Sequence, residues 1–280
     1  MRIIQSEEIT KAVSKMCIEA NCFLNDDIKN ALKSSIEKED SETGKAVLKT
    51  LLENADIAKE KVMPICQDTG MAVFFVEVGN EVLVSGKTLT EAINEGVRKG
   101  YTDGYLRKSI VRDPIDRVNT EDNTPAVIYY DFVKGDKIRI TFAPKGFGSE
   151  NKGGLRMLHP SDGIDGVIDF VIETVKKAGA NPCPPMVIGV GIGGTMDKAA
   201  YLAKLALTRD VDSKNPNPFY QELEEKLLEK INMLGIGPQG LGGTVTALGV
   251  NVEVFPTHIA GLPVAVNINC HVARHCTIFL

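Results

Sequence analysis

The stretch PMVIGVGIGGTMDKAAYLAKL, residues 185–205, decides the fold class. Its apolar start, rich in valine and isoleucine, predicts a short strand. The alanine- and leucine-rich run after the glycines predicts a helix over about 196–208. A strand that leads directly into a helix is the repeating unit of α/β proteins, so we expect that class.

Helical and strand patterns also alternate through the rest of the chain. We expect further helices over 6–22, 42–60, 88–103, 162–178 and 218–233. MAVFFVEVG and EVLVSG, after residue 70, predict paired strands, and PAVIYYDFV, KGD and KIRITFAPKG predict a hairpin. TVTALGVNVEVF and GLPVAVNIN predict two later strands. Together these segments predict mixed sheets flanked by helices in a single large domain that spans 1–280.

Glycine-rich segments lie between several of these elements. GVGIGGT matches G-x-G-x-x-G through Gly189, Gly191 and Gly194, the pattern of dinucleotide-binding loops. The acids at the expected distance, Asp210 and Asp212, precede SKNPNPFY, which cannot form the second strand of such a unit. We therefore interpret the loop as an anion-binding turn at the start of a helix. With KGFGSENKGG and GIGPQGLGG, it predicts a common ligand-facing surface, although ordinary surface turns remain an alternative.

Composition narrows the range of partners. The chain has 280 residues, a net charge of −5 and 43% hydrophobic residues, with mean hydropathy −0.04 and a pI near 5.5. This acidic balance argues against nucleic acid and anionic membranes as partners. No apolar run approaches the roughly 20 residues that span a bilayer, and MRIIQSEEITKAV is not a signal peptide. We expect a cytoplasmic protein with six reduced cysteines.

Three of the cysteines lie in loops or at strand ends: Cys66, Cys183 and Cys270. Cys17, by contrast, belongs to the apolar stripe of the helix at 6–22. Three separated thiolates suit a 4Fe–4S cluster with one open iron. Zinc is a rival, because CHVARHC offers Cys270, His271, His275 and Cys276, with the two histidines one helical turn apart. An ordinary polar turn at Cys66 also remains open.

Four longer motifs carry a family resemblance: CQDTG (66–70), KGFGSENKGG (145–154), CPPMVIGVGIGGTMDKAA (183–200) and PTHIAGLPVAVNINCHVARH (256–275). Together they closely resemble class I, iron–sulfur fumarate hydratases and the α subunit of the related L(+)-tartrate dehydratases. The likeness runs from about residue 5 to 276. It implies that Cys66, Cys183 and Cys270 hold a 4Fe–4S cluster.

The resemblance also implies a substrate shell of Gln67, Asp68, Arg107, Gly148 and His258. Gln67 and Asp68 correspond to residues that contact the dicarboxylate, and Arg107 to an arginine that binds a carboxylate. Arg112 and Arg117 lie close enough in the sequence to be alternatives for that arginine. Asp68 is expected to assist a base rather than to be the only one.

The implied reaction is the reversible dehydration of (S)-malate to fumarate in the tricarboxylic acid cycle, with L(+)-tartrate to oxaloacetate as the alternative. Single-chain members carry a C-terminal domain with the assigned base, and we expect a separate β subunit to supply it here. The resemblance further suggests an α2β2 heterotetramer with α–α contacts and an oxygen-sensitive cluster. A non-catalytic sensor that carries the cluster is the remaining alternative.

Overall fold

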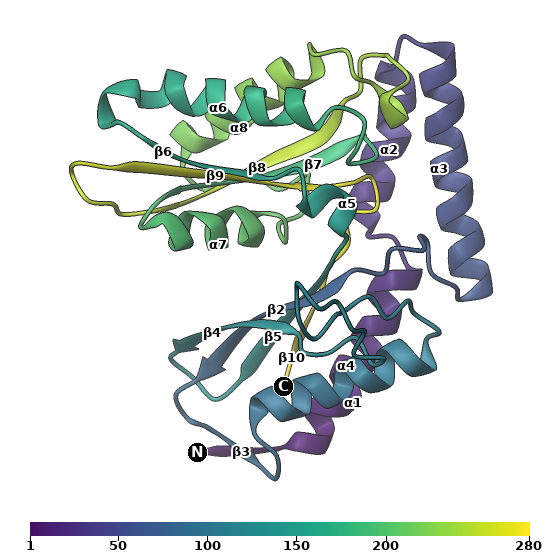
Figure 1. Ribbon diagram of the computed structural model, residues 1–280, viewed down its shortest axis with the longest axis vertical. Helices are drawn as coiled ribbons and strands as arrows, with labels where there is room; N and C mark the ends of the chain where they lie inside the picture. The colour runs from purple at the N-terminus through teal and green to yellow at the C-terminus, as the bar shows by residue number, and fades with distance from the viewer. The chain divides into compact units, whose positions relative to one another are not determined.

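Two units, each with its own four-stranded sheet, make up the computed structural model, which describes residues 1–280 (Figure 1). Unit 1 comprises Met1–Asn25, Ala55–Phe147 and Arg274–Leu280. Unit 2 comprises Asp26–Asn54 and Gly148–Ala273. Helices and mixed sheets confirm the predicted α/β class. That one domain spans 1–280 stays a prediction.

The sheet of unit 1 has the order β10-β5-β2-β4. Its central strand β2 (Met71–Gly79) is parallel to β4 (Val127–Val133) and antiparallel to β5 (Ile138–Lys145). β10 (Cys276–Phe279) extends the sheet beside β5. A separate parallel pair joins β1 (Arg2–Gln5) to β3 (Val82–Ser85).

Both predicted strand pairings in unit 1 are wrong. β4 and β5 do not form a hairpin, because β2 lies between them, and β3 pairs with β1 instead of β2. The cause lies in the apolar run of β2, in which residues 72–76 are all buried. A strand buried on both faces gains most as a central strand with a partner on each side.

Helices α1 (Ser6–Cys22) and α4 (Leu89–Asp103) lie side by side in unit 1 (Figure 1). α4 approaches closely through Gly96 and Gly100, since a Cβ on either would come within 2.6 Å of side-chain carbons of Val13 or Cys17. Cys17 is fully buried there, which confirms its predicted packing role. These helices and the sheet share one core, whose members include Ile9, Val13, Met16, Phe74, Val97, Tyr101, Ile140 and Phe142.

The sheet of unit 2 has the order β6-β9-β7-β8. β7 (Met186–Gly193) is parallel to β8 (Ala247–Phe255) and antiparallel to β9 (Leu262–Asn269), which pairs with β6 (Gly154–Leu158). α6 (Gly163–Ala178) and α8 (Pro218–Asn232) cover one face, and α7 (Met196–Ala206) covers the other (Figure 1). The remaining helices are α2 (Asp26–Lys38), α3 (Glu42–Lys61), α5 (Phe147–Glu150) and the 3-10 turns η1 (Pro160–Asp162) and η2 (Pro238–Gly240). α2, β1, β6 and β10 were not predicted.

Gly189 and Gly191, the first two glycines of the G-x-G-x-x-G pattern, lie inside β7, so the predicted anion-binding turn is wrong for them. A Cβ on Gly189 or Gly191 would collide with the carbonyl oxygen of Ala203 or Ala199 in α7. These glycines therefore let the helix pack closely on the sheet. Asp210 lies outside any strand, as predicted. The next strand along the chain, β8, pairs parallel to β7, so a parallel crossover does form, but after Asp210 and Asp212.

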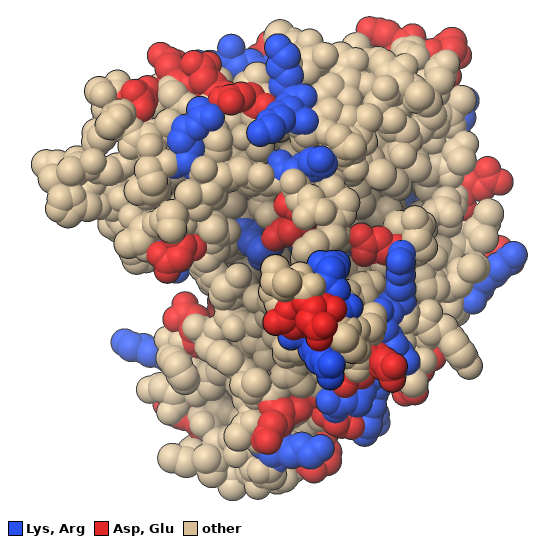
Figure 2. Space-filling view, viewed as in Figure 1, with Lys and Arg blue, Asp and Glu red and all other residues tan.

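Charge is mixed on the molecular surface. Figure 2 shows basic and acidic side chains interspersed over the visible face, with no extended patch of one sign. None of the helices combines the length and apolar character needed to cross a membrane.

Candidate functional site

The turn Cys66–Gly70 leads into β2 and carries three of the predicted site residues. Cys66 Sγ accepts a hydrogen bond from Asp68 N at 3.4 Å and donates to Gln67 Oε1 at 3.8 Å. Asp68 Oδ1 accepts from Gly70 N at 3.0 Å, and its Oδ2 accepts from Phe147 N at 2.9 Å. The carboxylate of Asp68 thus fixes both its own turn and the residue before Gly148.

Two buried side chains support this turn from within unit 1. The Tyr101 hydroxyl contacts the carbonyl oxygens of Thr69 and Gly70 at 2.8 and 3.1 Å. Burial strongly raises the pKa of Tyr101, so its hydroxyl remains protonated and donates. Arg274 Nη2 donates to the backbone oxygen of Asp68 at 2.6 Å. Three hydrogen bonds from these two side chains therefore hold the backbone oxygens of the turn that follows Cys66.

Arg107 lies next to the same turn. Its backbone oxygen accepts from Thr69 Oγ1 at 3.0 Å, and its side chain is exposed. The two alternative arginines make contacts within their own loop, Arg112 with Asp116 at 3.9 Å and Arg117 with the Pro114 oxygen at 3.4 Å. The hydrogen bond to Thr69 therefore places Arg107 beside the Cys66–Gly70 turn, whereas Arg112 and Arg117 are held within their own loop.

Cys183 and Cys270 lie at the same end of the sheet in unit 2. Cys183 precedes β7 and Cys270 follows β9, and the antiparallel pairing places Val187 opposite Asn269. His271 joins the two loops, with its backbone N–H 3.3 Å and its Nδ1 3.0 Å from the Cys183 oxygen. The structure thus brings these two predicted ligands together.

The loop that carries Cys183 has an unusual backbone. Cys183 has a φ of 55°, in the left-handed region that residues other than glycine rarely adopt. Gln239, from GIGPQGLGG, donates to the Pro184 oxygen through its N and Nε2, both at 2.8 Å. Such strained conformations persist where the surroundings enforce them, and they cluster at functional sites.

Gly148 lies near the Cys183 loop, while His258 lies far from it. A Cβ on Gly148 would meet only the Asn181 oxygen, at 3.9 Å, so space is open around it. His258 is exposed in the loop between β8 and β9, at the opposite end of β9 from Cys270. Eight strand residues separate those ends by roughly 23 Å. Within unit 2, His258 does not join the two cysteines.

Of the other three cysteines, Cys17 and Cys22 are buried in unit 1 and Cys276 is partly buried there. Burial raises the pKa of Cys17 and Cys22 and raises that of Cys276 to about 12. Cys276 Sγ contacts the Met16 oxygen at 3.8 Å. Protonated, buried thiols are poor metal ligands. The zinc alternative also assumed a helix at His271–His275, and that segment is not helical, so the assumption is wrong.

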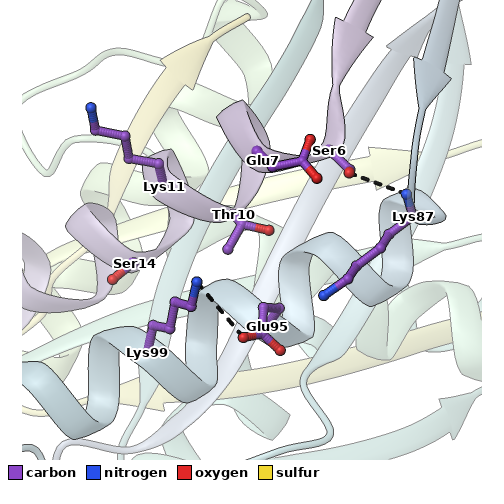
Figure 3. Close-up of a pocket in the computed structure, with 8 residues that line it drawn as sticks. All are labelled: Ser6, Glu7, Thr10, Lys11, Ser14, Lys87, Glu95 and Lys99. Carbon is purple, nitrogen blue, oxygen red and sulfur yellow. Dashed lines mark hydrogen bonds and ion pairs between the residues drawn. The ribbon is translucent and has the colours of Figure 1, made fainter.

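A separate pocket of about 250 Å³ lies between α1 and α4 in unit 1 (Figure 3). It is lined by Ser6, Glu7, Thr10, Lys11, Ser14, Lys87, Glu95 and Lys99. None of these is a predicted site residue. In Figure 3 a dashed line joins Lys99 to Glu95, an ion pair of 3.8 Å. Ions of both signs already face one another there, so the pocket favours no particular ligand charge.

Sequence reasoning missed the residues that support the turn and the loop. Tyr101, Arg274 and Gln239 touch backbone carbonyls rather than a ligand. Tyr101 falls on the apolar face of α4, where it looks like a core residue. Arg274 offered a signal, because it is a charged residue that follows the apolar pair Val272 and Ala273.

Comparison with known proteins identifies the family of the chain. The family model described as fumarate hydratase (fumerase) matches residues 10–279. A protein of Methanocaldococcus jannaschii named "Putative L(+)-tartrate dehydratase subunit alpha" is 44% identical over 273 residues, 95% of each chain. The "L(+)-tartrate dehydratase subunit alpha" of Escherichia coli K12 is 34% identical over 277 residues, 98% of this chain and 91% of its own. The chain belongs to the fumarate hydratase (fumerase) family of hydro-lyases.

Proposed function

We propose that this chain is the α subunit of an iron–sulfur hydro-lyase that reversibly dehydrates a 2-hydroxy dicarboxylate. One observation carries the proposal. This chain, which belongs to the fumerase family, has Cys66, Gln67 and Asp68 on a single hydrogen-bonded turn. A thiol for a cofactor and two polar groups for a substrate are thereby positioned by the same backbone. (S)-Malate and fumarate are the first substrate pair.

The thiols of Cys66, Cys183 and Cys270 fit a 4Fe–4S cluster. Thiolate sulfur is the usual ligand of such clusters. Cys183 is exposed and the other two are partly buried, unlike the core thiols Cys17 and Cys22. A cluster held by these three thiolates would supply a Lewis acid for the substrate hydroxyl. Cys66 belongs to unit 1, and Cys183 and Cys270 belong to unit 2.

The protein's own residues would bind and orient the substrate. Arg107 binds one carboxylate by charge-assisted hydrogen bonds, and the Gly148 backbone and Gln67 contact the dicarboxylate. Dehydration breaks the C–O bond at the hydroxyl carbon and the C–H bond beside it, forms C=C and releases water. A base on a β subunit takes the proton, assisted by Asp68, whose carboxylate also keeps the turn in place.

The position of His258 supports the proposal of a second copy of the chain in the complex. His258 lies roughly 23 Å from the end of β9 that bears Cys270, so its own unit cannot place it beside that cysteine. An α–α contact would let His258 of one copy serve the site of the other. We therefore propose the α2β2 assembly, with mass measurement of the complex as its test. A complex with a single α chain that turns over substrate at full rate would exclude it.

The second candidate substrate is L(+)-tartrate, which the names of the relatives favour. Tartrate and malate differ by one hydroxyl group. The test is an anaerobic assay of the α–β complex with malate, tartrate and methylated analogues. The higher kcat/KM assigns the substrate. A complex with an intact cluster that turns over neither would favour the sensor alternative.

Cofactor content and partner dependence complete the test. The α chain alone should be nearly inactive with its cluster intact, and anaerobic reconstitution should give a brown protein with about four irons per chain. Cys66→Ser, Cys183→Ser and Cys270→Ser should each abolish the cluster. Cys17→Ser, Cys22→Ser and Cys276→Ser are the matched controls and should retain it. A colourless chain with one bound zinc would refute the cluster.

A further inference from the structure

Arg274 is a buried cation without an anionic partner. Arg274 as a whole residue is only 5% exposed to solvent. The one hydrogen bond of its guanidinium is the 2.6 Å contact from Nη2 to the Asp68 backbone oxygen. Nε and Nη1 are buried and make no hydrogen bond. Buried charges are normally paired, because an unpaired one loses its hydration without compensation.

The groups that face Arg274 do not supply the missing negative charge. Tyr101 and Cys22 are close enough for their ionisation to depend on the charge of Arg274. Burial raises the pKa of both groups, so both are neutral near pH 7. The Asp68 carboxylate accepts from Gly70 N and Phe147 N, and Arg274 contacts only the backbone of that residue. The cation therefore faces neutral groups and a carbonyl.

Two hydrogen bonds connect Arg274 to Cys66. The first is the 2.6 Å contact with the Asp68 oxygen, and the second joins Asp68 N to Cys66 Sγ at 3.4 Å. The backbone of Asp68 links these two hydrogen bonds, so the guanidinium of Arg274 lies within about 10 Å of Cys66 Sγ. That range is about one Debye length at 0.1 M salt, so the charge of the buried guanidinium still acts on the partly exposed sulfur.

We propose that Arg274 is a positioning residue for Cys66 and also the buried counter-charge for the cluster that the Cys66 thiolate would bind. Its guanidinium fixes the Asp68 carbonyl and thereby the direction of Cys66 Sγ. Its charge stabilises the negative charge that a thiolate-ligated cluster brings to the turn. The second part rests on the proposed function, whereas the first does not. Because positive charge favours the reduced cluster, Arg274 also raises its reduction potential and slows its oxidation.

The first test uses the full chain without any cluster. Hydrogen exchange of the Asp68 and Gly70 amides should be about tenfold faster in Arg274→Gln, which loses a charged hydrogen bond. Arg274→Lys retains the charge and a donor and should stay nearer the wild type. Exchange in Arg274→Gln equal to that of the wild type would overturn the positioning role. If Arg274→Gln does not fold by circular dichroism, Arg274→Lys decides in the reconstituted complex of the second test. A midpoint potential equal to that of the wild type supports the role of the charge, and a lowered potential overturns it.

The second test uses the anaerobically reconstituted complex with its partner subunit. Tyr101→Phe is the matched control, because it removes a hydrogen bond to the same turn without removing charge. Arg274→Gln should lower the midpoint potential of the cluster and shorten its half-life in air, while Tyr101→Phe leaves the potential unchanged. Equal shifts in both variants would reduce Arg274 to a structural role. If the wild type binds no cluster, the proposed function fails, and the exchange experiment still decides the positioning role.

Discussion

Replacing Asp68 by Asn separates a structural role of this carboxylate from a role in substrate binding. Both carboxylate oxygens accept backbone hydrogen bonds, Oδ1 from Gly70 at 3.0 Å and Oδ2 from Phe147 at 2.9 Å. An asparagine amide retains only one oxygen. Its NH2 group would face the other backbone N–H, donor against donor. Asp68→Asn therefore breaks one of the two bonds whichever way the amide is oriented.

The size of the effect follows from these two contacts. A hydrogen bond to a charged group contributes about 1.5–3 kcal/mol. Phe147 is exposed, so water replaces the carboxylate in part, and Gly70 N–H retains its bond to the remaining oxygen. We expect a loss of about 1–2 kcal/mol in the free energy of unfolding. For a chain of this size that corresponds to a Tm lower by roughly 2–6 °C.

The assay is thermal unfolding of the chain without cofactor or substrate, followed by circular dichroism. Asp197→Asn is the matched control, because Asp197 is exposed at the start of α7 and its carboxylate accepts only local bonds, from Thr195 Oγ1 and from backbone N–H groups of the first helical turn. The control should shift the Tm by less than about 1 °C. An unchanged Tm in Asp68→Asn, together with lost activity in the complex, would refute the structural role. Substrate contact would then be the only role of this carboxylate.

Three further variants test other parts of the structure. Glu39 accepts from Ser41, Thr244 and Val245 backbone N–H groups at 2.8–2.9 Å; burial raises its pKa, but these donors outweigh burial and hold it below the ordinary 4.5. The stabilisation that Glu39 provides is therefore complete above pH 4.5 and is lost as the pH falls through the lowered pKa. Glu39→Gln should lower the free energy of unfolding in urea by about 2–4 kcal/mol at pH 7 and by less at pH 3. Gly191→Ala should displace α7 and cost about 1–3 kcal/mol, against no change for Gly261→Ala, whose Cβ meets only an atom at 4.0 Å. Arg107→Gln should lower kcat/KM of the complex about a hundredfold, while Arg112→Gln leaves it within about twofold; equal losses would contradict the assignment of Arg107.

Local patterns predicted the helices well because the information lies within each segment. The helix predicted over 6–22 is α1 with the same bounds, since its apolar stripe repeats with helical spacing and is buried along its length. Strand positions were also predicted, but strand partners were not. Pairing depends on which strand gains most from burial on both faces, and that is a property of the whole sheet. β2 therefore separates β4 from β5, although only a short turn joins those two in the chain.

The glycines of GVGIGGT show how one pattern serves two physical purposes. In a dinucleotide-binding loop, glycines bring backbone N–H groups close to a phosphate. In this chain Gly189 and Gly191 are strand residues that leave room for the carbonyl oxygens of α7. Both uses require a missing side chain, so spacing alone cannot distinguish them. The position of the strand end distinguishes them, and β7 continues to Gly193.

The cysteines mark the limit of sequence reasoning about the site. Their loop settings identified Cys66, Cys183 and Cys270 as a set, but only strand direction could say which of them are neighbours. Because β7 and β9 run antiparallel, the residue before one strand and the residue after the other meet at one end, and His271 then joins the two loops. The same rule sends His258 to the opposite end. One antiparallel pairing thus brings two proposed ligands together and separates His258 from both of them within unit 2.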